Sequence, residues 1–347
     1  MTFKNRRRLR VIRTFCIGWT LSLLFLTIIR GVGATEDGAI DFDISTSFLY
    51  ALTIGPLFGG ISGYAQIVTD ERFYKRTSAR KLLAIRISMS LAFLITLILV
   101  SYLIVPPLLD VDISLMDFAS DKGSSAIYFY ILSTDIFMAA LWQVNLMFGE
   151  NKLWKILMGA FYEPHEEDRI FMFLDLKDST QHAERLGHIK YSRLIQDCFN
   201  DLGVVIENEA EIYQYVGDEA VLTWRLQDGL RNQNCINAFY TFKSKLLKKQ
   251  PYYSKKYDCV PHFKASLNEG VITATEVGKY KKEIAYHGDT INTAARIQKK
   301  CNEFNQELLI SENLKNKITG STHEFIPLGD IPLKGKAQKV AIFAIQR

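Results

Sequence analysis

Four long apolar stretches in the first 149 residues constrain the fold of this chain more than any other feature. They cover residues 11–32, 44–68, 82–106 and 126–148. Each is long enough for an α-helix to cross the hydrocarbon core of a bilayer, which takes about 20 residues. Residues 150–347 have instead the mixed composition of a soluble α/β domain. We therefore expect an α-helical four-span transmembrane bundle over residues 1–149, followed by a soluble domain.

The charges that separate these stretches predict their orientation. The amino terminus and the connection 69–81 are basic, and the other two connections are acidic. The residues concerned are Lys4, Arg6, Arg7, Arg8, Arg10, Arg13, Arg72, Lys75, Arg76, Arg80 and Lys81, against Glu36, Asp37, Asp41, Asp43, Asp110, Asp112, Asp117 and Asp121. Lys and Arg concentrate in cytoplasmic loops. We expect a multi-pass protein of the cell (inner) membrane, in contact with lipid, whose two termini and soluble domain are cytoplasmic.

The amino terminus allows two other interpretations. A basic arm can bind nucleic acid, but one that directly precedes an apolar stretch more often anchors a helix, so no nucleic acid partner is expected. The first stretch can also be a cleaved signal peptide that ends near Gly33 and Ala34, although its apolar run is long for that. Three spans would then remain, and the carboxy-terminal half would stay inside.

Two features inside the spans concern packing. Gly55, Gly59 and Gly63 form a ridge of small residues that allows close helix contact, and packing within one bundle is favoured over a dedicated dimer seam. Asp135 lies deep in the fourth span, where an ionisable group usually faces the bundle interior. The sequence leaves open whether Asp135 senses a signal or only packs through hydrogen bonds.

The rest of the chain predicts a short helical linker over 150–167 and an α+β domain over 168–347. Strands are expected at 170–176, 260–273, 282–287, 306–311, 323–328 and 338–346, and helices at 189–206, 228–248 and 289–302. A hairpin is expected over 211–224, with Gly217 and Asp218 in a type II′ turn. This order favours helices packed against an antiparallel-rich sheet.

Two acidic residues stand where metal ligands are often found. Asp175 lies at the end of the first strand, and Asp218 lies at the tip of the hairpin. Together they can supply the oxygen ligands that Mg²⁺ prefers. Ser179 and Thr180 follow Asp175 and favour a helix start, whose free N–H groups form a phosphate-binding site. Taken singly, each Asp is equally compatible with a solvated turn.

Two basic elements follow later in the chain. Asn292 and Arg296 are four residues apart on one helical face, where they can stabilise developing charge on a phosphoryl group. Lys334 stands in a turn between two strands. The alternatives are an exposed helical face and a solvated turn.

Four motifs in this order resemble the catalytic domain of the class III adenylyl and guanylyl cyclases, in a membrane-anchored form. They read FLDLKDST, QYVGDE, YHGDTINTAAR and LKGK, and the resemblance covers most of residues 168–346. It implies a ferredoxin-like core and a head-to-tail dimer, in which both subunits contribute to each active site.

The resemblance also implies roles for individual residues. Asp175 and Asp218 match the aspartates that bind two divalent cations, Mg²⁺ or Mn²⁺. Asn292 and Arg296 match the pair that stabilises the transition state, and Lys334 matches the lysine that contacts the triphosphate. Because one chain carries all five, a homodimer is expected to contain two complete sites.

The base preference follows less directly from the motifs. Adenylyl cyclases usually carry Lys at the position of Gln214 and Asp or Thr at that of Ala285, whereas guanylyl cyclases usually carry Glu and a small polar residue. Gln214 can donate and accept hydrogen bonds, and the backbone near Ala285 can accept one. We expect ATP to be converted into 3′,5′-cyclic AMP and pyrophosphate by two-metal catalysis. The alternatives are a guanylate cyclase acting on GTP and a catalytically silent nucleotide-binding module.

Overall fold

The computed structural model describes residues 3–33, 44–73, 77, 79–108, 112–120, 122–149 and 152–346. Contacts divide the chain into two compact units, Met1–Phe148 and Gly149–Arg347. Several predicted features lie outside the described residues, namely Ala34, Glu36, Asp37, Asp41, Asp43, Lys75, Arg76, Asp110 and Asp121.

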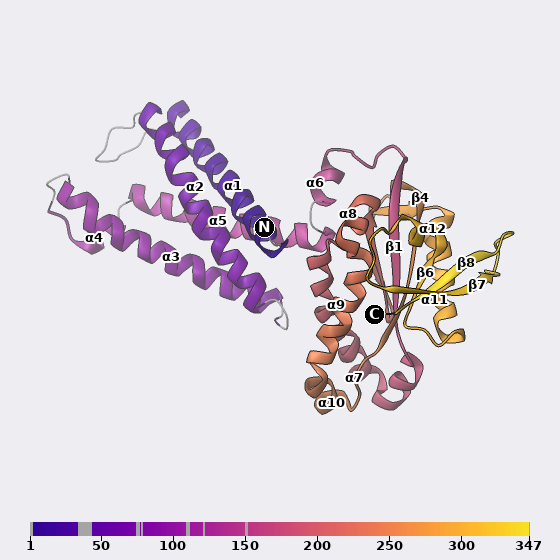
Figure 1. The fold of residues 1–347 in the computed structure, drawn as a ribbon. Helices are drawn as coiled ribbons and strands as arrows, with labels where there is room; N and C mark the ends of the chain where they lie inside the picture. The colour runs from indigo at the N-terminus through magenta and orange to yellow at the C-terminus, as the bar shows by residue number, and fades with distance from the viewer. Residues whose placement is uncertain are drawn as a thin grey trace. The chain divides into compact units, whose positions relative to one another are not determined.

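Helices make up the first unit, and strands and helices alternate in the second (Figure 1). The helices of the first unit are α1 (Phe3–Gly33), α2 (Ile44–Val68), η1 (Thr69–Phe73), α3 (Ala79–Leu108), α4 (Leu115–Ser120) and α5 (Lys122–Phe148). The second unit contains α6 (Lys152–Leu157), β1 (His165–Leu176), α7 (Ser179–Leu202), η3 (Gly203–Asn208), β2 (Glu211–Val216), β3 (Glu219–Arg225), α8 (Leu226–Leu230), η4 (Arg231–Gln233), α9 (Asn234–Lys248), α10 (Gln250–Tyr257), β4 (Phe263–Val277), β5 (Glu283–His287), α11 (Asp289–Glu303), β6 (Leu308–Ser311), α12 (Glu312–Lys317), β7 (Glu324–Ile331) and β8 (Val340–Gln346).

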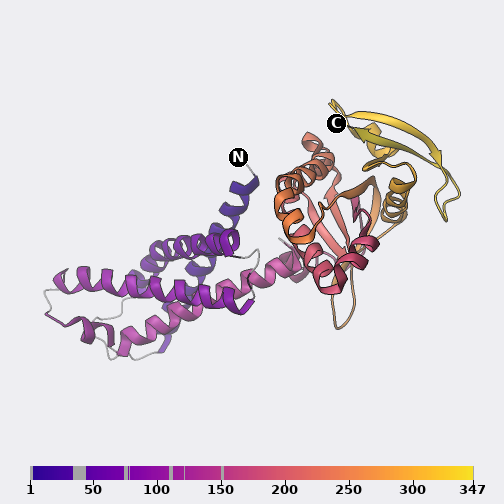
Figure 2. The same cartoon turned by 90° about the horizontal axis from the view of Figure 1, so that it is seen from below.

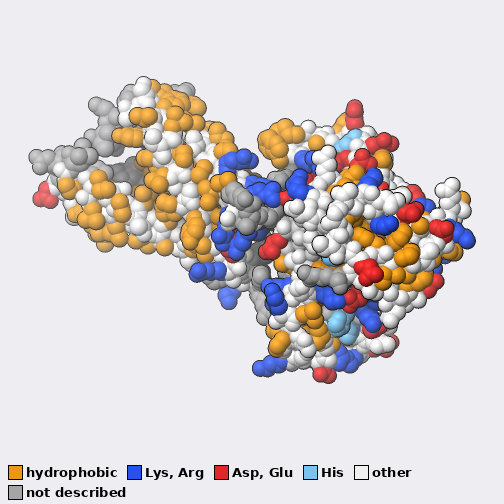
Figure 3. Space-filling model, viewed as in Figure 1, with side chains coloured by type: hydrophobic (Ala, Val, Ile, Leu, Met, Phe, Trp, Pro, Cys, Tyr) orange, Lys and Arg blue, Asp and Glu red, His pale blue; other side chains and the backbone are white. Residues whose placement is uncertain are grey.

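Four helices of the first unit are long and apolar enough to cross a membrane: Lys4–Gly31, Ile44–Arg72, Arg80–Ile104 and Ser125–Met147. Each predicted apolar stretch lies within one of α1, α2, α3 and α5. Apolar side chains cover much of the surface of this unit, and Lys and Arg gather at the end where α1 begins (Figure 3). The unit therefore has the surface expected of a bundle that lies in lipid.

The glycine ridge of α2 packs against α1. A Cβ atom added at Gly59 would lie 2.3 Å from the Cα of Cys16, and one at Gly55 would lie 2.7 Å from the Cα of Thr20. Real Cβ atoms do not approach a backbone so closely, so only glycine fits at these two positions. The ridge thus serves packing within the bundle.

Asp135 on α5 faces the interior of the bundle and forms an ion pair with Arg86 on α3. Arg86 Nη2 lies 2.6 Å from Asp135 Oδ1, and the hydroxyls of Ser62 and Ser90 also donate to this carboxylate. Arg86 and Asp135 are 4% and 5% exposed. The acidic group is therefore paired and hydrogen-bonded, as a buried charge requires.

An eight-stranded sheet forms the centre of the second unit, in the order β2-β3-β1-β4-β6-β8-β7, with β5 paired to β4. Within it, β1, α7, β2, β3, α9 and β4 form a βαββαβ unit whose antiparallel strands have the order β2-β3-β1-β4. This is the predicted ferredoxin-like arrangement. Figure 2 shows the β7–β8 hairpin extending from the rest of this unit.

The two faces of the sheet are covered by different helices. Ile170, Met172 and Leu174 of β1 point into the core beneath α7, α9 and α10, whereas Phe171 and Phe173 point to the other face, with α11. Figure 1 shows α7, α9 and α10 on one side of the strands and α11 on the other. Because side chains alternate along a strand, Asp175 lies on the same face as α11.

Several predicted boundaries were wrong. The helical linker expected over 150–167 is helical only over Lys152–Leu157 among its described residues, and β1 already begins at His165. Phe161 packs into the sheet core, and its carbonyl accepts a hydrogen bond from the backbone of Glu276. The segment that follows α6 is therefore part of the folded domain.

Two predicted helices also have other limits. The helix expected over 189–206 begins at Ser179, ends at Leu202 and contains a break at Gly187, whose φ is +70°. The helix expected over 228–248 is divided into α8, η4 and α9, and Asn232 and Gln233 adopt left-handed conformations between them. Helical periodicity shows neither kind of break, because it records only which side chains are apolar.

Candidate active site

Asp175 and Asp218 lie close together at one end of the sheet. Asp175 is the last but one residue of β1, and it lies directly opposite Glu219, the first residue of β3. Asp218 directly precedes Glu219 in the turn of the β2–β3 hairpin. Gly217 has a φ of +63° and Asp218 does not have a positive φ, as a type II′ turn requires. Three carboxylates therefore share one small region.

The pKa values of these carboxylates reflect that crowding. Burial and then the charge of Asp218 raise the pKa of Asp175. Burial and then the charges of Asp175 and Asp218 raise the pKa of Glu219 to about 7. Negative charge thus accumulates beyond what the surrounding cations neutralise, which favours a bound cation.

Two side chains on the α11 face support Asp175. Gln298 of α11 donates a hydrogen bond from Nε2 to Asp175 Oδ2 at 2.9 Å. Lys264 stands opposite Asp175 on β4, and its ammonium group donates to Asn302 while its charge lowers the pKa of Asp175. Asp175 is therefore held from one side by a neutral donor and from the other by a cation.

The helix start predicted next to Asp175 is present. Ser179 and Thr180 form the first turn of α7, and Asp178 before them adopts a left-handed conformation with a φ of 55°. Burial, and then the charge of Asp218, raise the pKa of Tyr191 on this helix to about 12. The first turn of α7 and both aspartates thus lie in one neighbourhood.

Asn292 and Arg296 lie on the part of α11 that faces away from the sheet. Asn292 is exposed, whereas Ala294, Ile297 and Gln298 are buried. Arg296 Nη1 lies 3.7 Å from Asp289 Oδ1 and makes no hydrogen bond within the described residues. Arg296 Nη1 is therefore a buried donor without a hydrogen-bond acceptor among the described residues.

The turn that contains Lys334 packs next to Arg296. A Cβ atom added at Gly335 would lie 3.4 Å from Arg296 Nη2. Lys334 itself is exposed, and it is Lys336 that contacts α11, through Asp289 Oδ2 at 2.7 Å and Thr293 Oγ1 at 2.9 Å. The pKa of Asp289 is lowered, and the hydrogen bond from Lys336 is the largest cause.

A polar cleft of about 310 Å³ adjoins this group. Asp289, Thr293, Ser311 and Lys336 are among its lining residues. The cleft lies between the start of α11, β4, α12 and the segment that leads into β8. The basic turn is therefore anchored beside a solvent-accessible space.

The two positions expected to read the base come from β2 and β5. Gln214 is exposed and pairs with Val221 on β3, and Ala285 is half-buried and pairs with Thr275 on β4. Their neighbours Tyr213 and Tyr286 have ring centroids 4.8 Å apart, and the Tyr213 hydroxyl accepts a hydrogen bond from the Tyr286 backbone N–H at 3.4 Å. This pair of tyrosines holds β2 near β5.

One chain brings the predicted residues together in two groups rather than in one. The first contains Asp175 and Asp218 beside the start of α7, and the second contains Asn292, Arg296 and the Lys334 turn. Arg296 and Gln298 are two residues apart, which corresponds to about 200° around an α-helix. Their side chains therefore point to opposite sides of α11. Gln298 meets Asp175, so Arg296 points away from it.

Sequence reasoning missed four residues of these groups: Glu219, Lys264, Gln298 and Lys336. Signals for two of them were present. Glu219 directly follows Asp218 in the hairpin, so the sequence already places it next to a predicted metal ligand. Gln298 also interrupts the run of apolar and small residues on one face of its helix, and a buried amide indicates a specific partner.

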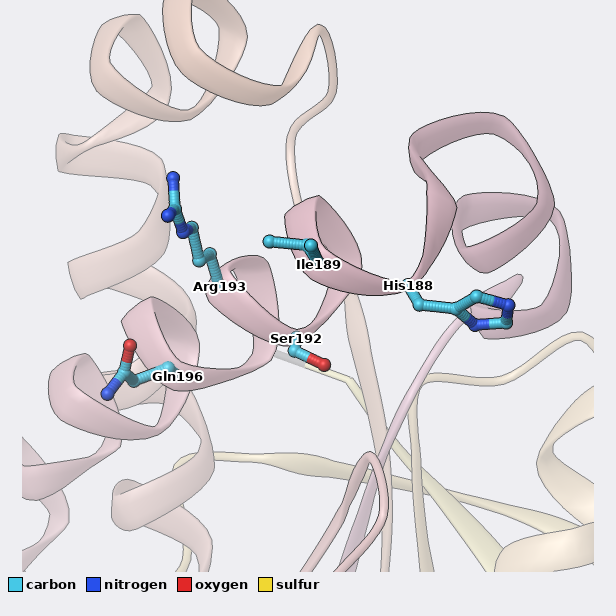
Figure 4. A pocket seen from close by; sticks show the side chains of 5 residues that line it. All are labelled: His188, Ile189, Ser192, Arg193 and Gln196. Carbon is cyan, nitrogen blue, oxygen red and sulfur yellow. The ribbon is translucent and has the colours of Figure 1, made fainter.

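A separate hollow lies on the surface of α7, and none of the predicted site residues line it. It has a volume of about 530 Å³ and is lined by His188, Ile189, Ser192, Arg193 and Gln196. Figure 4 shows these five side chains on the turns of α7 that follow the break at Gly187. The hollow is open to solvent, and its lining residues include no carboxylate.

Divalent cations fit the donor set at Asp175 and Asp218. The described residues contain no group of three or more His, Cys, Asp and Glu arranged to hold a metal ion. Mg²⁺ does not need one, because it keeps several waters and is usually bound by one or two carboxylates plus substrate phosphates. The oxygens of Asp175 and Asp218, next to the start of α7, meet the carboxylate part of that description.

Comparisons with known proteins point to one family. Residues 161–347 match the adenylate and guanylate cyclase catalytic domain family. The curated protein "Adenylate cyclase 2" of Rhizobium meliloti (strain 1021) is 31% identical over 220 residues, which span 62% of this chain and 60% of that protein.

A solved structure shares the fold, and a second one superposes less closely. A bacterial light-regulated adenylyl cyclase superposes with a TM-score of 0.55 at 15% identity, over 65% of this chain and 66% of that one. The adenylyl cyclase CyaB from P. aeruginosa superposes with a TM-score of 0.46 at 18% identity, over 53% of this chain and 96% of that one.

Proposed function

The chain belongs to the adenylate and guanylate cyclase catalytic domain family, and we propose that it is a membrane-bound adenylate cyclase. In this proposal it converts ATP into 3′,5′-cyclic AMP and pyrophosphate. The observation that carries the proposal is the joint position of Asp175 and Asp218 at one end of the sheet, beside the first turn of α7.

The residues of this end each have a task in the proposed reaction. Asp175 and Asp218 would hold two divalent cations. Such cations, when bound, supply Lewis acidity at the attacking 3′-hydroxyl and neutralise charge on the leaving pyrophosphate. The backbone N–H groups at Ser179 and Thr180 bind phosphate oxygens through the positive end of α7.

The second group acts on the phosphoryl centre and the triphosphate. Arg296 has an unused buried donor, and Asn292 is one turn away on the same side of α11. Both can stabilise the charge that develops on the α-phosphoryl oxygens. Lys334, in the turn that packs against Arg296, neutralises the triphosphate. Positioning and charge stabilisation suffice, because phosphoryl transfer needs no side-chain nucleophile.

The opposite orientation of Gln298 and Arg296 supports a composite site. Within one chain, α11 turns Asn292 and Arg296 away from Asp175. The two groups can meet when a second copy supplies one of them. We therefore propose a homodimer in which Asp175 and Asp218 of each subunit face Asn292 and Arg296 of the other, which gives two complete sites.

The membrane assignment rests on the first unit. The starts of α1 and α3 carry basic residues, and so does η1 with Arg72. Arg8 of α1 forms two hydrogen bonds from its guanidinium to Glu71 at 2.8 Å and 2.6 Å. Cytoplasmic loops are the basic ones. We propose that α1, α2, α3 and α5 cross the inner membrane, that the cyclase domain is cytoplasmic, and that the bundle regulates it.

The choice of ATP rests on Gln214 and on the sequence relative that bears the name of an adenylate cyclase. The direct test incubates the purified full chain, in lipid nanodiscs, with ATP or GTP and with Mg²⁺ or Mn²⁺. The products are then identified by mass spectrometry. The proposal predicts cyclic AMP and pyrophosphate in equal amounts. Cyclic GMP alone would make the chain a guanylate cyclase, and no cyclic product from either nucleotide would make it a silent module.

A further inference from the structure

Gln298 makes the most specific contact in the region around Asp175. It is 7% exposed, and its Nε2 donates to Asp175 Oδ2 at 2.9 Å. The other buried residues on the same face of α11 include Ala294, Ile297 and Cys301, which are small or apolar. A buried amide in such a row is expensive unless it is hydrogen-bonded, so its presence calls for a polar partner.

The position of Gln298 suits a role in orienting Asp175. Asp175 lies at the end of β1, where the strand gives way to the turn before α7, and it has like charges from Asp218 and Glu219 nearby. Repulsion between these groups favours rotation of the carboxylate away from them. A donor that occupies Oδ2 opposes this rotation, and the carboxylate, which also receives a hydrogen bond from the backbone of Leu176, retains lone pairs for another ligand.

The backbone of α11 holds Gln298 in place. The hydroxyl of Ser266 on β4 donates to Ala294 O at 2.7 Å, and the thiol of Cys301 donates to Ala265 O at 3.3 Å. These bonds attach the helix to β4 on both sides of Gln298. Its amide therefore comes from an element that is fixed to the sheet and not from a movable loop.

From this geometry we propose that Gln298 is a positioning residue that orients Asp175 as a metal ligand within its own subunit. The proposal rests on the proposed function, because it takes Asp175 as a cation-binding residue. In the proposed dimer, α11 then takes part in both sites. Its inner face holds Asp175 of one site, and its outer face delivers Asn292 and Arg296 to the other.

The first test measures metal binding directly. Mn²⁺ is titrated into the purified full chain in the presence of 3′-deoxy-ATP, which has no attacking hydroxyl, and free Mn²⁺ is followed by electron paramagnetic resonance. Loss of a hydrogen bond to a ligating group typically weakens metal affinity by about 10–100-fold. Gln298→Leu is expected to raise the Kd for Mn²⁺ by about tenfold. An unchanged Kd would overturn the proposal.

Glu303→Gln serves as the matched control for this titration. Glu303 lies at the exposed end of the same helix and pairs with Lys300 at 2.6 Å. Its substitution should leave the Kd for Mn²⁺ unchanged. If both variants weaken Mn²⁺ binding equally, the effect belongs to the helix as a whole and the positioning role is refuted.

The second test asks in which subunit Gln298 acts. Arg296→Ala chains and Asp175→Ala chains with different affinity tags are co-expressed, and mixed dimers are isolated. Such a dimer retains one site, built from Asp175 of the first chain and Arg296 of the second. Gln298→Leu placed in the first chain should lower its activity by about tenfold, and in the second chain it should not.

The outcomes separate this inference from the proposed function. Equal loss from either placement, or loss only from the second chain, would contradict the positioning role. If the mixed dimer shows no activity even with Gln298 intact in both chains, the composite dimer site is wrong. The Mn²⁺ titration then still decides whether Gln298 supports the metal ligand.

Discussion

Asp175 on β1 lies directly opposite Glu219 on β3 in an antiparallel pair. Like charges in such a cross-strand pair destabilise a sheet, and neighbouring pairs contribute about 0.2–1 kcal/mol. The pairing of Asp175 with Glu219 therefore does not contribute to the stability of the sheet. The proposed cation site would account for the pairing of Asp175 with Glu219.

Replacement of Glu219 is expected to raise the Tm of the cyclase domain and to weaken its response to Mg²⁺. Glu219→Gln removes the repulsion, so the cyclase domain should melt at a Tm higher by about 1–4 °C in the presence of EDTA. Because the site loses negative charge, the Mg²⁺ concentration for half-maximal activity should rise several-fold, by roughly 3–10 times. Thermal melting and a Mg²⁺ titration of the same samples measure both effects. A lower Tm together with unchanged Mg²⁺ dependence would contradict this account.

The attachment of α10 to α7 should depend on pH. Asp197 is 8% exposed and accepts hydrogen bonds from Tyr252 at 2.5 Å, Tyr257 at 2.6 Å and Lys256 at 2.8 Å. Burial alone would raise the pKa of Asp197, but these bonds outweigh burial and lower it. The stabilisation is therefore present above the pKa of the unfolded chain, and it is lost as the pH falls through the lower, folded value.

Hydrogen exchange of α10 amides measures this dependence. Asp197→Asn should exchange faster than the unchanged chain at pH 6, and the difference should shrink steadily towards pH 3. Glu312→Gln, at an exposed position of α12, serves as the control. A difference that grows as the pH falls would show that Asp197 has the opposite sign of linkage.

Loss of either Arg86 or Asp135 alone should destabilise the bundle. Replacement of both residues by apolar ones should be tolerated. Either Arg86→Leu or Asp135→Leu leaves a buried charge without its partner, which is expected to cost about 3–5 kcal/mol of bundle stability. Arg86→Leu combined with Asp135→Leu should recover most of that loss. A double-mutant cycle of thermal unfolding in detergent measures the coupling, with Thr96→Ala as the control. Additive losses would exclude the ion pair.

The base preference should respond to Gln214 and Ala285 together. Gln214→Lys with Ala285→Asp supplies a charged donor and an acceptor for adenine, so the ratio of kcat/KM for ATP to that for GTP should rise at least about tenfold. Gln227→Lys, at an exposed position of α8, adds the same charge elsewhere and should not change this ratio. An unchanged ratio in the double variant would place base recognition at other residues.

The elements that the sequence predicted well are those with a strong local signal. The apolar stretches became α1, α2, α3 and α5, and the hairpin at Gly217 and Asp218 has the predicted turn. The failures occurred where tertiary contacts decide the outcome. The residues after α6 become part of the sheet domain because Phe161 packs against it, and α7 continues across Gly187 because both halves pack on the same core.

The site could be predicted only in part for a related reason. The motifs predicted Asp175, Asp218, Asn292 and Arg296 as residues of one reaction, but they did not predict that α11 turns the last two away from the first. Gln298, Glu219 and Lys264 gain significance only from the sheet register and from the packing of α11. Spacing along the chain does not contain that information.

Turnover by Asp175→Ala tests the central claim most directly. The purified full chain and this variant are incubated with ATP and Mg²⁺ or Mn²⁺, and cyclic AMP is measured over time beside the circular dichroism spectrum of each protein. The account predicts cyclic AMP from the unchanged chain and a rate lower by at least about a hundredfold in the folded variant. A residue that binds the cation directly matters more than one that only hydrogen-bonds to such a residue. Cyclic AMP formed at similar rates by both proteins would contradict it.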